Sequence, residues 1–170
     1  MMNLKKDLHA AKTVALRYLS RAPRSIKEVE LKLKEKGITG DALKETIGYL
    51  IDRSYLNDDL FAKNWVNSKT KTQLWGQQRI REGLKQKGIH DEIIKRAIDT
   101  LGGETTELDR AESALKKWLR TKAKYIQGPQ KNKATTQKAL RHLQAKGFSI
   151  SVIIAAIKKY YGESATYEGQ

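Results

Sequence analysis

Apolar residues recur along the chain in three sets, each at the same spacing from a glycine. The glycines are Gly37, Gly88 and Gly147, and each follows a lysine and has a leucine four positions upstream. Downstream, apolar side chains stand at offsets of 6, 10 and 13 from the glycine. Steps of 4 and 3 mark one face of an α-helix, so a helix is predicted after each glycine. These positions are Leu43, Ile47 and Leu50, then Ile94, Ile98 and Leu101, then Ile153, Ile157 and Tyr160.

A second helix is predicted before each glycine. A glycine fits the left-handed residue that follows a helix, where a side chain would clash. Twelve residues upstream of the glycines stand Ser25, Gly76 and Thr135, which are all acceptable N-cap residues. Ser25 and Glu28 also form the pattern of a capping box. Each set therefore predicts a helix, a tight glycine turn and a further helix.

A third helix is predicted upstream of each pair, marked by an aromatic residue followed by an aliphatic one. The aromatic residues are Tyr18, Trp65 and Trp118. Their helical spacing from other apolar positions favours packing in a core over a platform for base stacking. Trp75, in a polar connector, fits either a surface contact or local hydrophobic stapling.

These elements predict an all-α protein of three tandem three-helix, helix-turn-helix-like repeats that form an elongated, curved body. The predicted repeats span residues 1–56, 57–103 and 104–163, and residues 164–170 are expected to be a disordered tail.

The charge of the chain predicts the class of its binding partner. The chain has 34 Lys+Arg against 19 Asp+Glu, a formal charge of +15, and residues 113–162 hold 12 basic residues and no acidic one. An acid-free stretch of this kind favours an anionic partner over an inert solvated surface. Lys116, Lys117, Arg120 and Lys124 recur at helical spacing, which places them on one face. The full set of candidate contacts is Lys69, Lys71, Arg79, Arg81, Lys85, Lys116, Lys117, Arg120, Lys124, Lys131, Lys133, Lys138 and Arg141.

Catalytic and metal chemistry find little support in the sequence. The chain has no cysteine, and its three histidines lack metal-binding spacing. Asp58 and Asp59 are adjacent, so they fit a first helical turn better than a metal site. The sequence shows neither an apolar secretory leader nor a transmembrane run. We therefore expect a cytoplasmic non-enzyme that uses no cofactor or metal.

Several segments, taken together, resemble the RecX family. They are ALRYL at 15–19, RSIKEV at 24–29, KL at 32–33, YLNDDLFA at 55–62, GQQRI at 76–80, Leu84 and KGI at 87–89. Ser54 and Lys69 depart from the family pattern, where glycine and arginine are usual. Lysine cannot make the bidentate contact of arginine, which puts Lys69 in doubt as a contact. The resemblance implies three-helix units, no cofactor, and modulation of RecA, usually inhibitory.

The resulting hypothesis is a monomeric regulator that binds RecA filaments on single-stranded DNA and inhibits their recombinase and ATPase activity. Contacts with the DNA would be to its backbone, and no membrane is involved. One alternative is a stand-alone DNA-binding protein of the helix-turn-helix type. Another is a helical-repeat scaffold without a DNA role. The sequence leaves open whether the filament is inhibited or stabilised, and which repeat contacts RecA.

Overall fold

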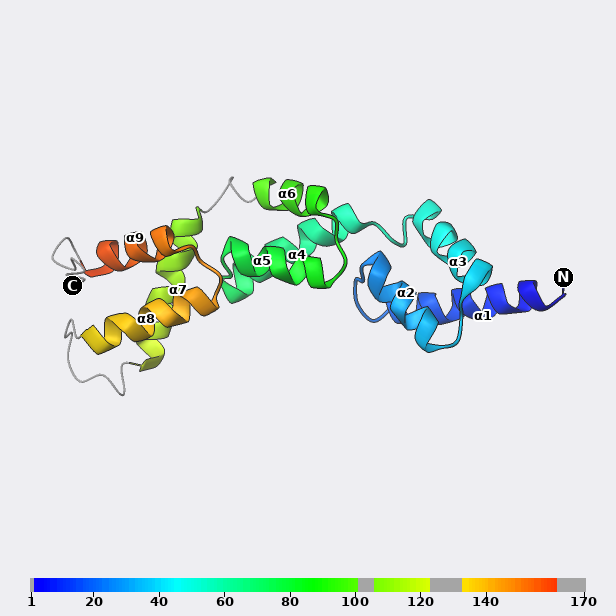
Figure 1. Cartoon of the computed structure of the whole chain (residues 1–170), viewed down its shortest axis with the longest axis horizontal. Coiled ribbons are helices and arrows are strands. Elements are labelled where there is room, and N and C mark those ends of the chain that lie inside the picture. The colour runs from blue at the N-terminus through cyan, green and yellow to red at the C-terminus, as the bar shows by residue number, and fades with distance from the viewer. Residues whose placement is uncertain (1, 101–105, 123–132, 162–170) are drawn as a thin grey trace. The chain divides into compact units, whose positions relative to one another are not determined.

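The computed structural model describes residues 2–100, 106–122 and 133–161 (Figure 1). Within these ranges the chain forms nine α-helices and no strand, which confirms the predicted all-α repeat fold. The helices are α1 (Met2–Leu19), α2 (Ile26–Glu35), α3 (Gly40–Asp52), α4 (Asp58–Gln73), α5 (Gln77–Gln86), α6 (Asp91–Asp99), α7 (Glu107–Lys122), α8 (Lys133–Ala145) and α9 (Ile150–Tyr161). No helix in the described ranges is long and apolar enough to cross a membrane.

The chain divides into two compact units. The described residues of 1–64 and 84–97 form the first unit, and those of 65–83 and 98–170 form the second. The division passes through α4, α5 and α6, so the middle set of three helices contributes to both units.

The core of the first unit lies among α1, α2 and α3, which pack on one another. Tyr18 is half-buried against this core, as predicted for the aromatic positions. The apolar faces predicted on either side of Gly37 both point inward, because the two helices bury their aliphatic side chains against α1. The buried residues of this core are Ala11, Ala15, Val29, Leu33, Ile47, Leu50 and Leu56.

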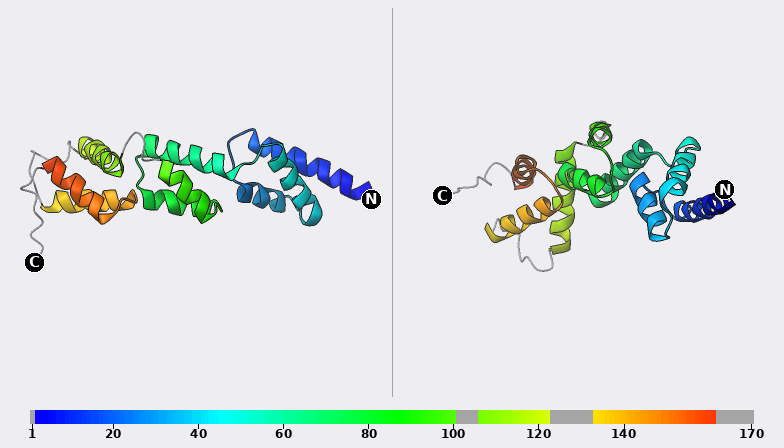
Figure 2. Two further views of the ribbon diagram at one scale, coloured as in Figure 1. Left: turned by 90° about the horizontal axis from the view of Figure 1, so that it is seen from above. Right: turned by 45° about the vertical axis from the view of Figure 1, so that its right-hand side comes forward.

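The core of the second unit lies among α7, α8 and α9, which again pack on one another (Figure 2). Trp118 is half-buried against it and stacks on His142, with ring centroids 5.6 Å apart. Tyr160, the last of the apolar positions predicted after Gly147, lies in α9 as predicted but is 43% exposed, one residue before the helix ends. The buried residues of this core are Ala111, Ala114, Leu115, Ala139, Leu143, Phe148, Ile153, Ala156 and Ile157.

The structure confirms the predicted glycine turns between helices. Gly37, Gly88 and Gly147 have φ angles of +77°, +79° and +81°. Ser25 caps α2 in a complete capping box with Glu28. The prediction of an N-cap at position 135 was wrong, because α8 already begins at Lys133. Leu101 and the predicted tail at 164–170 lie outside the described residues.

Candidate nucleic-acid interface

The glycine turn that follows α5 packs on the start of α2, and we call this contact the first joint. The Ser25 hydroxyl donates a hydrogen bond of 2.7 Å to the Lys87 carbonyl oxygen. A Cβ placed on Gly88 would lie 2.2 Å from the Lys27 side chain, so the turn approaches α2 closely. This approach requires glycine for space as well as for backbone conformation.

An ion pair closes the first joint. Lys87 Nζ lies 2.7 Å from Glu28 Oε1, and both side chains are about three-quarters buried. Burial raises the pKa of Glu28, but the hydrogen bonds from Lys87 and the Ser25 backbone and the charges of Lys87 and Arg24 outweigh it, so the pKa is lowered overall. The cation of this turn is therefore neutralised by a carboxylate of the helix on which it packs.

The glycine turn that follows α8 packs on the start of α5 in the same way, and we call this contact the second joint. The Gly76 N–H donates to the Lys146 carbonyl oxygen at 2.8 Å, and the Gln78 N–H donates to the Gly147 carbonyl oxygen at 3.1 Å. A Cβ on Gly76 would lie 2.3 Å from the Gly147 carbonyl oxygen. A Cβ on Gly147 would lie 2.4 Å from the Arg79 Cβ. Both glycines are therefore needed for backbone contact.

Cations without carboxylate partners occupy the second joint. Lys146 Nζ donates to the Gln73 carbonyl oxygen, and Arg79 Nη1 donates to the Ala145 carbonyl oxygen, both at 2.6 Å. Burial, followed by the charges of Lys117 and Arg79, lowers the pKa of Lys146. Among the residues that the structure describes, no ion pair joins a carboxylate to these three cations. The joint therefore holds net positive charge.

Two tryptophan rings lie beside Arg79 and a further cation, Lys69. Trp65 and Trp75 meet edge to face, with ring centroids 5.6 Å apart. The Arg79 guanidinium carbon lies 4.3 Å from the Trp75 centroid, and Lys69 Nζ lies 5.1 Å from it. Cations over an indole face are attracted by its quadrupole. Together with Lys117 and Lys146, the residues Lys69, Arg79 and Trp75 form what we call the second-joint cluster.

Each joint also contains an acid that caps the helix on which the glycine turn packs. Asp58, the first residue of α4, accepts from the Ile26 N–H at 3.0 Å. Glu107, the first residue of α7, accepts from the Gln77 N–H at 2.9 Å. Asp58 and Asp59 lie in the first turn of α4, as predicted. The bond from Asp58 to α2 was not predicted, and in α4 itself Asn57 Oδ1 accepts from the Leu60 N–H. Carboxylates at these positions are stabilised by the helix dipole.

The structure gathers only some of the predicted contact residues. Lys69, Arg79 and Lys117 belong to the second-joint cluster. Lys71 and Arg81 are exposed on α4 and α5, and Lys85 belongs to the first unit, where it pairs with Asp91. Exposed side chains on α7 are Lys116 and Arg120, and on α8 they are Lys138 and Arg141. Outside the described residues are Lys124, Lys131 and the side chain of Lys133.

Sequence reasoning missed Lys146. It was recognised only as the lysine that precedes Gly147 in the repeat pattern, and it is absent from the candidate contacts. The signal that could have found it is the alignment of the repeats, since three positions after Ser25 stands Glu28, whereas three positions after Gly76 stands Arg79. This difference predicts that the lysine of the following turn meets an acid in one joint and a base in the other.

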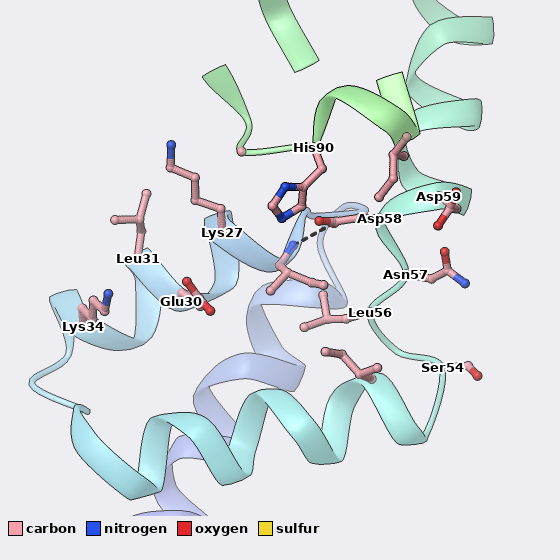
Figure 3. A pocket seen from close by; sticks show the side chains of 14 residues that line it. Lys27, Glu30, Leu31, Lys34, Ser54, Leu56, Asn57, Asp58, Asp59 and His90 are labelled. Carbon is pink, nitrogen blue, oxygen red and sulfur yellow. Dashed lines mark hydrogen bonds between the residues drawn. The ribbon is translucent and has the colours of Figure 1, made fainter. Parts of the chain in front are cut away.

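A hollow of about 650 Å³ lies beside the first joint, among α2, the end of α3 and the starts of α4 and α6 (Figure 3). Lys27 and Lys34 line it together with Glu30, Asp58 and Asp59. Burial raises the pKa of Asp58, despite its bond from the Ile26 backbone. A lining of both charges does not select an anion, in contrast to the second-joint cluster. In the described ranges, no group of three or more potential ligands could hold a metal ion.

Comparison with known proteins identifies the first two sets of three helices. Residues 11–50 match the family model of the first three-helix domain of RecX, and residues 57–98 match that of the second. The regulatory protein RecX of Chlorobaculum tepidum is 31% identical over 156 residues, which cover 92% of this chain and 91% of that protein. The chain belongs to the RecX family. The two matched ranges fall within the first two repeats proposed from the sequence.

Other RecX proteins extend the comparison. The regulatory protein RecX of Bacillus licheniformis is 37% identical over 148 residues, covering 85% of this chain and 53% of that relative. The chain thus spans about half the length of the Bacillus relatives that it matches. The crystal structure of RecX from Lactobacillus salivarius superposes with a TM-score of 0.75 at 28% identity, covering 91% of this chain and 97% of that chain.

Proposed function

We propose that this protein is a monomeric, cytoplasmic regulator that binds RecA filaments on single-stranded DNA and inhibits ATP hydrolysis and strand exchange. It acts without a cofactor, because occupying the filament obstructs RecA and requires no bond to be made or broken. Membership of the RecX family supports this proposal, and so does the net charge of +15. The observation that carries it is the second-joint cluster, where positive charge gathers with no carboxylate partner among the residues that the structure describes.

Repeated weak contacts suit a repeating partner. The filament presents the same protein surface and the same DNA backbone at regular intervals, and the chain presents helical repeats with basic faces. Contacts made by one chain add through effective concentration, so individually weak contacts give firm binding. The DNA contribution falls as salt rises, because bound phosphates release counterions.

The test is RecA-catalysed, single-strand-dependent ATP hydrolysis while this protein is titrated in, with binding to the same DNA measured without RecA. We expect inhibition well below the concentration that coats naked DNA. Glu substitutions at Lys116, Lys117 and Arg120 together should weaken inhibition at least about tenfold, since each removes a favourable phosphate or acidic-surface contact.

A matched control reverses three exposed lysines outside the candidate set, Lys36, Lys44 and Lys63. It carries the same change in net charge and should retain inhibition. Tight DNA binding without any effect on hydrolysis would favour the stand-alone DNA-binding alternative. Absence of both activities would favour the scaffold.

A further inference from the structure

The two joints place different charges at one equivalent position. Glu28 and Arg79 each stand three residues after the residue that contacts the next glycine turn, Ser25 or Gly76. In the first joint, Glu28 pairs with the lysine before the glycine, Lys87. The second joint repeats the turn and its lysine but replaces the acid by arginine. The first joint therefore has a stabilising ion pair at the place where the second joint has two cations.

The second joint holds these cations in place without neutralising them. Carbonyl oxygens of Gln73 and Ala145 each take one donor, and Trp75 supports the guanidinium. A lysine offers three donors and an arginine five, so most of the donors remain available to a ligand. The charges of Lys117 and Arg79 lower the pKa of Lys146 further after burial, and Lys146 in turn contributes, after burial, to the lowered pKa of His142. This part of the second unit therefore carries a positive potential that an anion would relieve.

We propose that a phosphodiester group of single-stranded nucleic acid binds between Arg79 and Lys146, in the place that the Glu28 carboxylate fills in the first joint. Arginine supplies planar paired donors to phosphate oxygens, and lysine supplies a point charge. The proposal rests on the proposed function and deepens it, since it names the DNA-binding site. The bound phosphate neutralises the joint and so holds the turn after α8 more firmly on the start of α5.

A polymer fits the surroundings better than a single ion. Lys69 flanks the site beside Trp65 and Trp75, and Lys117 continues it along α7, where Lys116 and Arg120 are also exposed. Aromatic rings interleaved with cations are typical of surfaces that bind single strands. Successive phosphates of one strand can therefore contact successive cations.

The first experiment is fluorescence anisotropy of a short labelled oligothymidylate, without RecA, over a series of salt concentrations. We expect Arg79→Glu to weaken binding by about tenfold or more and to reduce the salt slope by about 0.7 for each phosphate that the variant no longer neutralises. Arg17→Glu is the matched control, since it makes the same charge change at an exposed position of the first unit. Its affinity should stay within about twofold of wild type, because an exposed charge outside the site is largely screened by salt. Equal weakening in both variants would overturn the site.

The second experiment is the thermal midpoint with and without ligand, because a ligand that binds the native state stabilises it. Oligothymidylate, intact or abasic, should raise the midpoint of the wild type and raise that of Arg79→Glu much less, since the new carboxylate already pairs with Lys146. Inorganic phosphate should act more weakly than either. A response to inorganic phosphate alone would overturn the proposal of a nucleic-acid site.

Two further results separate this site from the proposed function. If Arg79→Glu lowers the ligand-free midpoint, Lys146→Gln replaces it in both experiments, with the same expected decrease in oligothymidylate affinity. Unchanged DNA affinity in both variants, with wild-type inhibition of RecA intact, would overturn the site and leave the function standing. If the variants bind DNA more weakly than the wild type, and the wild type does not inhibit RecA, the site would stand and the proposed function would be overturned.

Discussion

The first and second joints share an acceptor, the carbonyl oxygen of the lysine before a glycine, and differ in their charges. In both, the carbonyl oxygen of the lysine before a glycine accepts a hydrogen bond from the residue before a helix. In both, an acid at the start of the following set caps that helix. Among the described residues, only the first joint contains a lysine paired with a carboxylate of the helix on which its turn packs. One repeated contact therefore serves as a closed structural joint at one place and as an open cationic site at the other.

This difference shows how a repeat protein gains a site without changing its fold. The packing of a glycine turn on a helix start depends on space and on a donor to the lysine carbonyl oxygen, which is the Ser25 hydroxyl in the first joint and the Gly76 N–H in the second. The charge at the third position of the contact is independent of that packing. A single exchange of acid for base then alters the electrostatics of one joint and leaves its geometry in place.

The largest expected effect on the free energy of unfolding comes from a substitution that disrupts the packing shared by the two joints. Gly147→Ala adds a side chain at a φ of +81° and within 2.4 Å of the Arg79 backbone nitrogen and Cβ. We expect a decrease of about 2–4 kcal/mol in the free energy of unfolding, from left-handed strain and overpacking together. Gly37→Ala is the matched control, because its φ is +77° but nothing lies within 4 Å. Its free energy of unfolding should fall by only about 1 kcal/mol.

Urea unfolding followed by circular dichroism measures both variants. The difference between them reports the close contact of the second joint, since the backbone strain is common to both. Equal decreases would mean that the turn after α8 is not tightly packed on α5.

The sequence predicted the parts of the joints but not the joints themselves. Apolar offsets and left-handed glycines are local signals, so Gly88, Gly147 and the capping box of Ser25 were predictable. Contact between Gly76 and Lys146 joins residues 70 positions apart, and local patterns carry no information on which turn meets which helix. Arg79 was therefore predicted as a basic candidate, while its relation to Lys146 needed the structure.

An intermediate effect tests the closed joint. Glu28→Gln keeps a side chain that can cap α2 but removes the charge that pairs with Lys87, which should cost about 1 kcal/mol near neutral pH. Because the pKa of Glu28 is lowered in the folded state, its contribution is present above the ordinary value of 4.5 and is lost as pH falls through the folded pKa. The difference in stability between wild type and variant should therefore shrink below about pH 4.5.

Thermal midpoints of the two proteins across this pH range provide the measurement. The pKa of Asp58 is raised by burial and acts in the opposite direction, so only the difference between wild type and variant isolates Glu28. A difference that stays constant down to low pH would show that the charge of Glu28 does not stabilise the first joint.

The smallest expected effects on the free energy of unfolding come from replacing the lysine before the glycine, and they differ between the two joints. Lys87→Gln removes half of an ion pair and should lower the free energy of unfolding by about 0.5–1 kcal/mol. Lys146→Gln removes a cation whose charge is disfavoured by those of Lys117 and Arg79, so relief of repulsion offsets the removal of its hydrogen bond to Gln73. We expect a change between zero and a gain of about 0.5 kcal/mol at low salt, and less at high salt, where the repulsion is screened. Paired denaturation curves at two salt concentrations measure both variants. A decrease at Lys146 as large as that at Lys87 would mean that both lysines act as structural donors and that the second joint carries no unrelieved charge.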